Sequence, residues 1–227
     1  MFLTDKSRDF PIEYKKGVVK FLNCKIDLSK RPFIPRIETE YWVKKAIGDV
    51  RMLECSNVGM LKILDMFAGS GCIGIAILKN IKNSTCDFGE IDENSLEQIR
   101  TNLKINKIER GRARVIKTNI FSNIKRKYDY IFANPPYVAE ERIKEVQPEV
   151  LKYEPKKALL AGPAGLFYIR KLLSEAKNFF KKEGMIYLEI DPRQKEEIKK
   201  ILEKENYSKF QFLKDQFKKY RWVKIRN

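Results

Sequence analysis

The sequence predicts an α/β fold in which helices cover both faces of a mostly parallel sheet. From Leu61 onward, short apolar runs that are typical of buried strands alternate with longer segments that have helical periodicity. This alternation is typical of parallel strands joined by helical crossovers, which cover the two faces of the sheet. With 227 residues, of which 43% are hydrophobic, the chain is long enough to form one such domain around a sizeable core.

A small β appendage is predicted ahead of this domain. Residues 11–27 have the pattern of two short strands around Lys16-Gly17. Helical periodicity follows from Thr39 to Val50, and residues 51–60 are predicted to form a loop. The appendage is therefore expected to be a short β-hairpin that precedes the first helix.

Seven strands are predicted in all for the main sheet. They span residues 61–65, 85–91, 113–118, 128–133, 185–190, 209–213 and 221–225. The predicted helices between and after them span residues 71–82, 93–105, 165–181 and 194–204. The last two strands have a short connection, which predicts one antiparallel strand at an edge of the sheet. We place the β-hairpin appendage in residues 1–35 and the main domain in residues 36–227.

The composition excludes several kinds of chemistry. The chain has no histidine, so histidine acid–base catalysis and histidine-ligated metal sites are impossible. Its cysteines, Cys24, Cys55, Cys72 and Cys86, lack metal-ligand spacing, so reduced thiols of a cytoplasmic protein and no metal are expected. No apolar run is long enough to span a bilayer and the N-terminus lacks a secretory apolar stretch, so no membrane partner is expected.

A net charge of +17 arises from 47 Lys and Arg residues against 30 Asp and Glu residues. Such an excess is typical of a protein that works beside an anionic partner, such as RNA or ribosomal material. A solvated, lysine-rich surface explains the excess equally well, because the basic residues are spread along the chain rather than interleaved with aromatic residues. The charge alone leaves both interpretations open.

The most informative segment follows the predicted strand at 128–133 and reads Asn134-Pro135-Pro136-Tyr137. The Asn134 side chain offers a carbonyl oxygen, and Pro135, which has no N–H, offers a main-chain carbonyl. Two neighbouring acceptors can hold a planar NH2 group, and the Tyr137 ring can pack against it. The segment is therefore suited to presenting an amide or an aromatic amine to an electrophile, although an ordinary strand-to-loop turn can have the same sequence.

A glycine-rich turn joins the first core strand to its helix. Gly69 and Gly71 allow the backbone to approach a ligand, and Gly74 allows the helix to pack closely on the sheet. Such a turn can serve a dinucleotide, S-adenosylmethionine or no ligand at all. Asp65 at the strand end favours S-adenosylmethionine, because a carboxylate repels a pyrophosphate but attracts the ammonium group of the methionine part.

Polar residues also follow the next two strands. Glu90 ends the second strand at a position comparable with the acidic residue that binds ribose hydroxyls in nucleotide folds. Asp92 competes for this role, but its place one step into the turn favours helix N-capping instead. Asn119, after the third strand, is placed to contact an adenine amine.

Taken together, these motifs resemble the class I, Rossmann-like methyltransferases that use S-adenosyl-L-methionine to modify amino groups. Two further segments are similar to signatures of the HemK/PrmC family of release-factor glutamine methyltransferases. Residues 34–40 match its "PR-x-x-TE" pattern, and residues 154–166 match its "EP…AL…G…GL" pattern. The resemblance extends from Tyr14 to Ile190. The Asn-Pro-Pro-Tyr motif alone is less specific, because DNA adenine and rRNA guanine methyltransferases share it.

For this chain the resemblance implies methylation of the glutamine side-chain amide in the Gly-Gly-Gln motif of a peptide-chain release factor, the protein of translation termination. The implied catalytic residues are Asn134, Pro135 and Tyr137. The implied cofactor-binding residues are Asp65, Phe67, Ala68, Gly69, Gly71, Glu90, Asn119 and Asn134. The implied substrate-binding residues are Asn134, Pro135, Pro136, Tyr137, Arg36 and Glu38, with Glu154 and Pro155 bracing the opposite wall.

The chain departs from the family pattern in three places. Asn119 stands where the family usually has Asp, and residues 66–68 differ from the usual loop. The sequence also begins near the hairpin that follows a helical domain in the family, so the substrate is expected to dock without that domain. We expect a monomer whose protein substrate is a release factor, with the ribosome or RNA close by.

Two other functions stay open at this point. An rRNA or DNA methyltransferase would use the same motif on the exocyclic amine of a flipped base. The basic charge favours that function, and the similarity at residues 154–166 disfavours it. A non-catalytic module that binds S-adenosylmethionine or the ribosome is disfavoured because Asp65 and Asn134 are both present.

Overall fold

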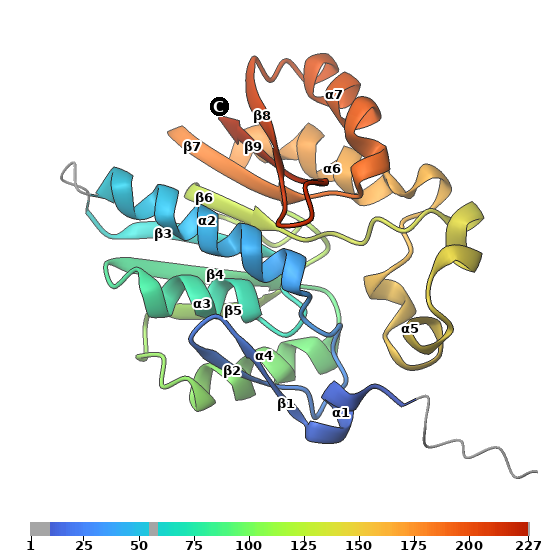
Figure 1. Cartoon of the computed structure of the whole chain (residues 1–227). Helices are drawn as coiled ribbons and strands as arrows, with labels where there is room; N and C mark the ends of the chain where they lie inside the picture. The colour runs from blue at the N-terminus through green and yellow to red at the C-terminus, as the bar shows by residue number, and fades with distance from the viewer. Residues whose placement is uncertain (1–9, 55–58, 227) are drawn as a thin grey trace, which may run out of the picture.

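The computed structural model describes residues 10–54 and 59–226, which form a central sheet between two layers of helices (Figure 1). The strands are β1 (Val18–Phe21), β2 (Cys24–Asp27), β3 (Leu61–Met66), β4 (Ser84–Glu90), β5 (Ala113–Lys117), β6 (Tyr128–Ala133), β7 (Phe180–Glu189), β8 (Lys209–Lys214) and β9 (Tyr220–Arg226). The α-helices are α1 (Ile12–Lys16), α2 (Ile37–Glu54), α3 (Cys72–Asn80), α4 (Glu93–Ile105), α5 (Pro148–Tyr153), α6 (Phe167–Glu175) and α7 (Lys195–Lys204). Short 3₁₀ turns are η1 (Glu140–Glu145), η2 (Lys156–Ala158), η3 (Pro163–Gly165), η4 (Ala176–Phe179) and η5 (Pro192–Gln194).

The main sheet of the described residues has seven strands in the order β5-β4-β3-β6-β7-β9-β8. Strands β5 to β7 in this order are mutually parallel, and β9 is antiparallel to both of its neighbours. The predicted mostly parallel, Rossmann-like sheet with one antiparallel strand is therefore confirmed. The predicted edge position of that strand is wrong, because β9 inserts between β7 and β8 and leaves β8 at the edge.

Helices cover both faces of the sheet, as predicted. On one face, α2, α3 and the N-terminal hairpin share a hydrophobic core that includes Trp42, Ile75 and Phe21. On the other face, α6 and α7 contribute Leu172 and Leu202 to a second core. A parallel sheet needs this double cover because its strands are apolar on both sides.

The turn of the N-terminal hairpin differs from the prediction. Residues Ile12–Lys16 form α1 rather than a strand, and Gly17 ends that helix with a left-handed φ of 69°. The hairpin turn lies at Leu22-Asn23 instead, because Phe21 pairs with Cys24. Leu22 has a φ of 50°, a conformation that leucine seldom adopts, so the turn signal there rested on Asn23 and was weaker than that of Gly17.

Carboxamide side chains of α4 and of its C-cap, Asn106, attach this hairpin to the domain. Asn106 accepts from the Lys25 N–H at 3.0 Å and donates to the Lys25 carbonyl at 2.7 Å. One turn earlier, Asn102 accepts from the Asp27 N–H at 2.8 Å and donates to the Ser70 carbonyl in the glycine-rich turn. The free edge of β2 is thus satisfied by helix side chains spaced four residues apart. The domain boundary at residue 35 stays a prediction.

Several element ends also differ. Helix α2 runs from Ile37 to Glu54, so the first residues of the predicted 51–60 loop are helical, and residues 55–58 lie outside the described residues. The predicted helix at 165–181 is α6 followed by the turn η4. Strand β7 begins at Phe180, five residues early, because buried Phe180 pairs with Tyr128 and an irregular register then carries the strand across the polar residues that follow.

The structure describes three of the four cysteines. Cys24, Cys72 and Cys86 are buried free thiols, and Cys55 lies outside the described residues. Within residues 10–54 and 59–226, no helix has both the length and the apolar character needed to cross a membrane.

Gly74 provides a test of the packing between α3 and the sheet. A Cβ at this position would lie 2.4 Å from a ring carbon of Phe88 and 2.8 Å from Cys86 Sγ, and Phe88 is fully buried. We expect Gly74→Ala to lower the free energy of unfolding by about 1–3 kcal/mol, because overpacking outweighs the gain in helix propensity.

Gly48 is the matched control for this substitution. It is exposed in α2, and a Cβ there would meet nothing within 4 Å. Gly48→Ala is expected to raise the free energy of unfolding by roughly 0.5–1 kcal/mol in the same urea titration. Equal effects of the two substitutions would contradict the close α3–sheet contact.

Candidate active site

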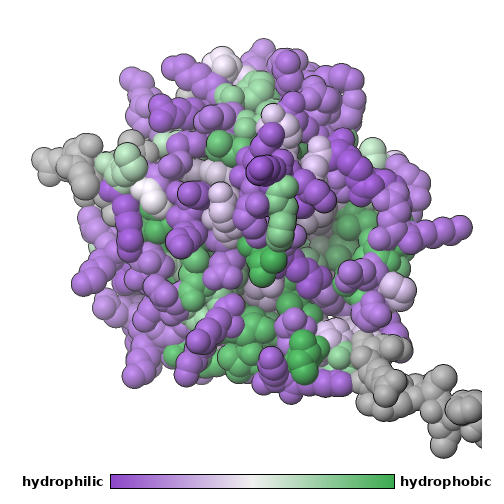
Figure 2. Space-filling view, in the orientation of Figure 1, coloured by the Kyte–Doolittle hydropathy of each residue, from purple (hydrophilic) through white to green (hydrophobic). Residues whose placement is uncertain are grey.

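A cavity of about 930 Å³ opens where the carboxyl ends of β3, β4, β5 and β6 meet. The connections from β3 proceed through β4 and β5 in one direction along the sheet and return to β6 on the other side of β3. Ligands of open α/β sheets bind at such a point of reversal, because the loops there diverge and leave a crevice. In Figure 2 most of the surface is hydrophilic, and hydrophobic residues gather beside a hollow on the side of α5.

The glycine-rich turn forms one wall of this cavity. Phe67, Gly69 and Gly71 all have positive φ, at 60°, 53° and 78°, so the backbone curls tightly between β3 and α3. Phe67, Ala68 and Gly69 line the cavity, whereas Gly71 is the N-cap of α3 with no place in the wall. The strained φ of Phe67 holds its ring against Tyr168, with the ring centroids 5.7 Å apart.

Asp65 lies beneath this turn rather than in the cavity wall. Its side chain is fully buried, and Oδ2 accepts a hydrogen bond from the Gly74 N–H at 2.8 Å. Oδ1 has no hydrogen-bond partner among the described residues. Burial, assisted by the nearby charge of Glu90, raises the pKa of Asp65 to about 8 against the single Gly74 N–H that lowers it. The carboxyl is therefore mostly protonated at neutral pH when no cation is beside it.

Glu90 and Asn119 line the cavity at the ends of β4 and β5. Glu90 Oε2 accepts from the Gly69 N–H at 2.9 Å, and its Oε1 accepts from the N–H groups of Ile91 and Asp92. The carboxylate thus joins the glycine-rich turn to the neighbouring strand end. Asp92 N-caps α4 by accepting from the Ser95 N–H at 3.0 Å, which confirms the capping prediction.

All four residues of the Asn134-Pro135-Pro136-Tyr137 segment line the same cavity. They follow β6, which pairs with β3, so the segment lies directly beside the glycine-rich turn. The Asn134 Nδ2 donates to Thr39 Oγ1 at 3.4 Å, and the Tyr137 hydroxyl donates to Glu189 Oε1 at 3.2 Å. The structure therefore brings together the two motifs that the sequence analysis predicted to form one site.

Glu189 is a buried acid that the sequence analysis missed. It ends β7 with 1% of its surface exposed, and its Oε2 accepts from Thr39 Oγ1 and Trp42 Nε1, both at 2.6 Å. Burial raises its pKa, whereas its donors and the positive charge of Arg221 lower it. The available signal was a single acidic residue within the otherwise apolar run 185–190.

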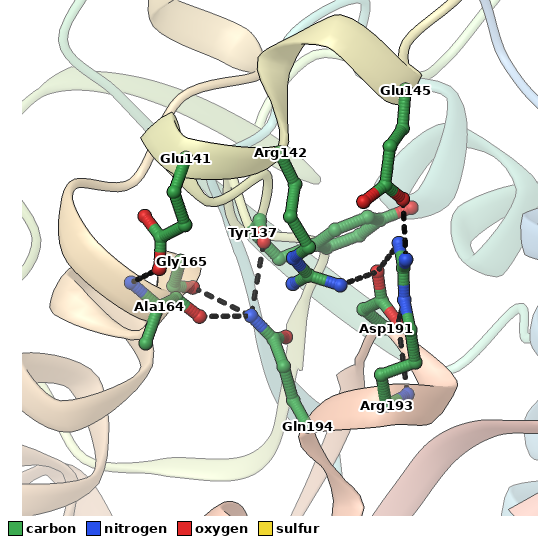
Figure 3. A network of polar contacts seen from close by, with 9 residues as sticks. All are labelled: Tyr137, Glu141, Arg142, Glu145, Ala164, Gly165, Asp191, Arg193 and Gln194. Carbon is green, nitrogen blue, oxygen red and sulfur yellow. Dashed lines mark hydrogen bonds and ion pairs between the residues drawn. The ribbon is translucent and has the colours of Figure 1, made fainter.

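Gln194, also missed, holds the loop that continues from Tyr137. Figure 3 shows its Nε2 between three carbonyl oxygens, those of Tyr137 at 3.0 Å, Ala164 at 2.9 Å and Gly165 at 3.0 Å. A Cβ on Gly165 would lie 2.1 Å from the Tyr137 carbonyl oxygen, so only glycine fits there. The cavity wall after β6 is thus fixed against the segment 159–165.

Charged side chains fix the outer part of this loop. Arg142 Nη1 lies 3.4 Å from Asp191 Oδ2, and Arg193 contacts both Asp191 at 3.1 Å and Glu145 at 2.5 Å (Figure 3). These pairs connect η1 to the turn that follows β7. They are partly exposed, so each contributes little stability alone, and their effect is to orient the loop.

The predicted substrate-side residues are only partly in the wall. Arg36 lines the cavity, with its guanidinium 4.5 Å above the Phe33 ring and its Nη2 2.5 Å from Glu154 Oε1. Glu154 is buried and also accepts from the Ile34 N–H at 3.0 Å. Glu38 does not line the cavity, whereas its neighbour Thr39 does.

Asp65 leads to a prediction about pH. Its folded-state pKa of about 8 lies above its ordinary value of 3.8, so between these values the folded chain retains a proton that the unfolded chain has lost. The free energy of unfolding should therefore fall as pH rises from about 4 to about 8, by up to about 1.4 kcal/mol per pH unit. Asp65→Asn should remove this slope while its amide oxygen still accepts from Gly74. A difference between the variant and the natural protein that stays constant over this range, measured by urea unfolding, would rule the raised pKa out.

Two comparisons with known proteins bear on this site. The family model described as the methyltransferase small domain matches residues 50–162. A release factor glutamine methyltransferase of Thermodesulfovibrio yellowstonii is 32% identical over 206 residues, which are 90% of this chain and 72% of that protein. The enzyme of the same name from Fusobacterium nucleatum is 32% identical over 207 residues. That alignment covers 90% of this chain but only 56% of the Fusobacterium protein, so the chain spans little more than half the length of that relative.

A solved structure with the same fold is the ribosomal protein L11 methylase of Lactobacillus delbrueckii subsp. bulgaricus, with a TM-score of 0.58 and 20% identity. The superposition covers 88% of this chain and 82% of that chain, and at this identity it supports the fold alone. The sequence relationship is closer and extends over both motifs of the cavity. The chain belongs to the release factor glutamine methyltransferase family.

Proposed function

We propose that this protein transfers a methyl group from S-adenosylmethionine to the side-chain amide nitrogen of the glutamine in the Gly-Gly-Gln motif of a peptide-chain release factor. The observation that carries the proposal is the position of Asn134, which lies in the wall of one cavity with the glycine-rich turn. The names of the relatives support the substrate. The remaining support comes from the chemistry of the cavity wall.

The residues present fit S-adenosylmethionine. The cavity volume lies in the range of small-molecule sites, about 300–1,000 Å³, and its wall carries a carboxylate at the end of β4. Beneath the turn, Asp65 Oδ1 is a buried acceptor with no partner among the described residues, which suits a cationic amino group nearby. We infer that Glu90 accepts from the ribose hydroxyls and that Ile91, an exposed apolar residue of the wall, packs beside the base.

The substrate amide needs positioning more than it needs a base. An amide nitrogen is a poor nucleophile because resonance delocalises its lone pair into the carbonyl group. Asn134 Oδ1 and the Pro135 carbonyl, by accepting its two N–H groups, would return electron density to nitrogen and align it for attack. Orientation of this kind supplies a part of the roughly 7–11 kcal/mol available from preorganisation.

The bound cofactor would supply a methyl group already activated by its sulfonium sulfur. An N–CH3 bond would form as the S–CH3 bond breaks, and the acceptor dipoles of Asn134 and Pro135 would stabilise the positive charge that develops on nitrogen. The surplus N–H proton then passes to solvent, because a cationic amide nitrogen is strongly acidic. No general base is required, which agrees with a chain that contains no histidine.

The rest of the wall would hold the planar amide in place. Tyr137 offers a ring face, and its hydroxyl is tied to Glu189. Arg36 and Glu154 join the segment before α2 to the segment after α5, so they keep the substrate side of the cavity open. Pro155, Phe33 and Phe167 add apolar surface to the same entrance.

Methylation of an exocyclic amine in rRNA is the second candidate function. The net charge of +17 favours it, because a basic protein gains affinity for nucleic acid from counterion release. The membership in the release-factor family favours the protein substrate. The two functions differ in the atom that receives the methyl group, so one experiment separates them.

That experiment uses labelled S-adenosylmethionine with release factor in one reaction and rRNA in another. We expect label in the release factor alone, on the glutamine amide nitrogen by mass spectrometry of its peptides. Label in rRNA alone would replace the protein substrate with the nucleic-acid substrate. Label in neither would overturn the enzymatic proposal.

Asn134→Ala tests the role of the carboxamide acceptor. We expect methyl incorporation into release factor to fall about a hundredfold or more, because loss of one preorganised group of this kind has that effect. The dissociation constant for S-adenosylmethionine, measured by calorimetry, should change by only a few fold, since the residues proposed to hold the cofactor lie mainly in the turns after β3 and β4.

Asn178→Ala is the matched control. Asn178 is an exposed asparagine in η4, away from the cavity wall, and its substitution should leave both quantities unchanged. Full activity of the Asn134→Ala variant would remove Asn134 from the proposed mechanism.

A further inference from the structure

We propose that Thr39 and Glu189 are positioning residues that decide which end of the Asn134 carboxamide faces the substrate. The proposal rests on the methyltransferase function proposed above. It concerns a chain of hydrogen bonds that runs from the buried end of β7 through the first turn of α2 to the cavity wall. Neither Thr39 nor Glu189 received a functional role from the sequence motifs.

The chain of hydrogen bonds begins at a group that can donate a hydrogen bond but cannot accept one. The indole N–H of Trp42 can only donate, so Glu189 Oε2, at 2.6 Å from it, is an acceptor. Thr39 Oγ1 lies 2.6 Å from the same oxygen and donates its single proton there. The distances are typical of hydrogen bonds to a charged acceptor. The Thr39 hydroxyl therefore has only its lone pairs left for other neighbours.

This arrangement determines the orientation of Asn134. Its Nδ2 donates to Thr39 Oγ1, at a distance of 3.4 Å that makes the bond weak. The importance of this hydrogen bond is which atom donates and which accepts, rather than its strength. If the carboxamide were flipped, Oδ1 would face the lone pairs of Thr39, and two acceptors would repel each other. The favoured orientation leaves Oδ1 to accept from a substrate N–H.

The flipped orientation would also be unproductive for the substrate. It would turn the Asn134 NH2 group toward the NH2 group of the glutamine amide, so donor would meet donor. Thr39 is nearly fully buried at 2% exposure, and Glu189 is fastened by three donors from α2 and the loop after β6. The acceptor that faces the Asn134 NH2 group is therefore held in place by the buried acid.

Thr39→Val tests the inference with minimal change in shape, because valine keeps the branched side chain and removes the hydroxyl. We expect kcat for release-factor methylation to fall at least tenfold, with the dissociation constant for S-adenosylmethionine changed by less than about threefold. Thr39→Ser retains the hydroxyl and should recover most of the lost kcat. Thr101→Val is the control, since Thr101 binds only the Glu97 carbonyl on α4, outside the cavity wall.

Glu189 supplies an independent variant if Thr39→Val folds poorly, which thermal unfolding and cofactor titration would reveal. Glu189→Gln can place its amide oxygen at the position of Oε2 and still accept from Thr39 and Trp42, whereas Glu189→Leu cannot. We expect the leucine variant to lose at least ten times more kcat than the glutamine variant. In a double variant, Thr39→Val should add little to the loss caused by Glu189→Leu, because both act through one chain of bonds.

Three results would overturn the positioning role while leaving the proposed function intact. These are a Thr39→Val enzyme within twofold of the natural kcat, a serine variant as impaired as the valine variant, and equal losses for the leucine and glutamine variants of Glu189. Failure of the natural protein to methylate release factor would instead overturn the proposed function itself. The two failures are distinguished by the activity of the unsubstituted protein.

Discussion

The parallel pairing of β3 with β6 is the constraint on which the rest of the structure depends. The register aligns Asp65 with Phe132 and Met66 with Ala133, so both strands end at the same level. The turn after β3 and the segment after β6 then emerge side by side, although Asn134 is far from the turn in the sequence. Because the helices that follow these two strands pack on opposite faces of the sheet, the loops separate above the strand ends and leave the cavity.

Two buried carboxyl groups, those of Glu189 and Asp65, lie below this cavity and differ in how many hydrogen bonds they accept. Glu189 accepts from three side chains, and the positive charge of Arg221 lies nearby, so these groups offset part of the rise in its pKa that burial causes. Asp65 accepts from one backbone N–H and retains an unpartnered oxygen. A fully satisfied buried network specifies a unique geometry, whereas an incompletely satisfied one is suited to meeting a ligand. Glu189 therefore fixes the geometry of the site, whereas Asp65 is suited to binding a ligand.

The sequence predicted most of the sheet because apolar runs and helical periodicity report burial, and burial determined those elements. The expectation that the Gly69 turn and Asn134 share a site came from the family resemblance, and the two meet because both follow parallel strands that end at the same level. Prediction failed where a tertiary contact decides the outcome. Leu22 adopts a left-handed turn without a turn-forming side chain, and β9 inserts beside β7 because long-range pairing chooses its neighbour. Asp65, which was predicted to bind the cofactor, lies buried beneath the turn rather than in the cavity wall, and its role stays a prediction.

Glu189 shows why the residues of the site cannot all be found from local sequence motifs. Its isolation in an apolar strand marks it as unusual, but its meaning depends on α2, whose first turn brings Thr39 and Trp42 to the end of β7. The contact joins residues 150 positions apart in the sequence. Residues 34–42 therefore contribute to both ends of one network. Arg36 and Thr39 line the cavity, and Thr39 together with Trp42 donates to the acid beneath it. The motif before the sheet and the motif after β6 therefore act together. Thr39 of the first motif binds both Glu189 and Asn134 of the second, so the orientation of Asn134 depends on an acid that neither motif contains.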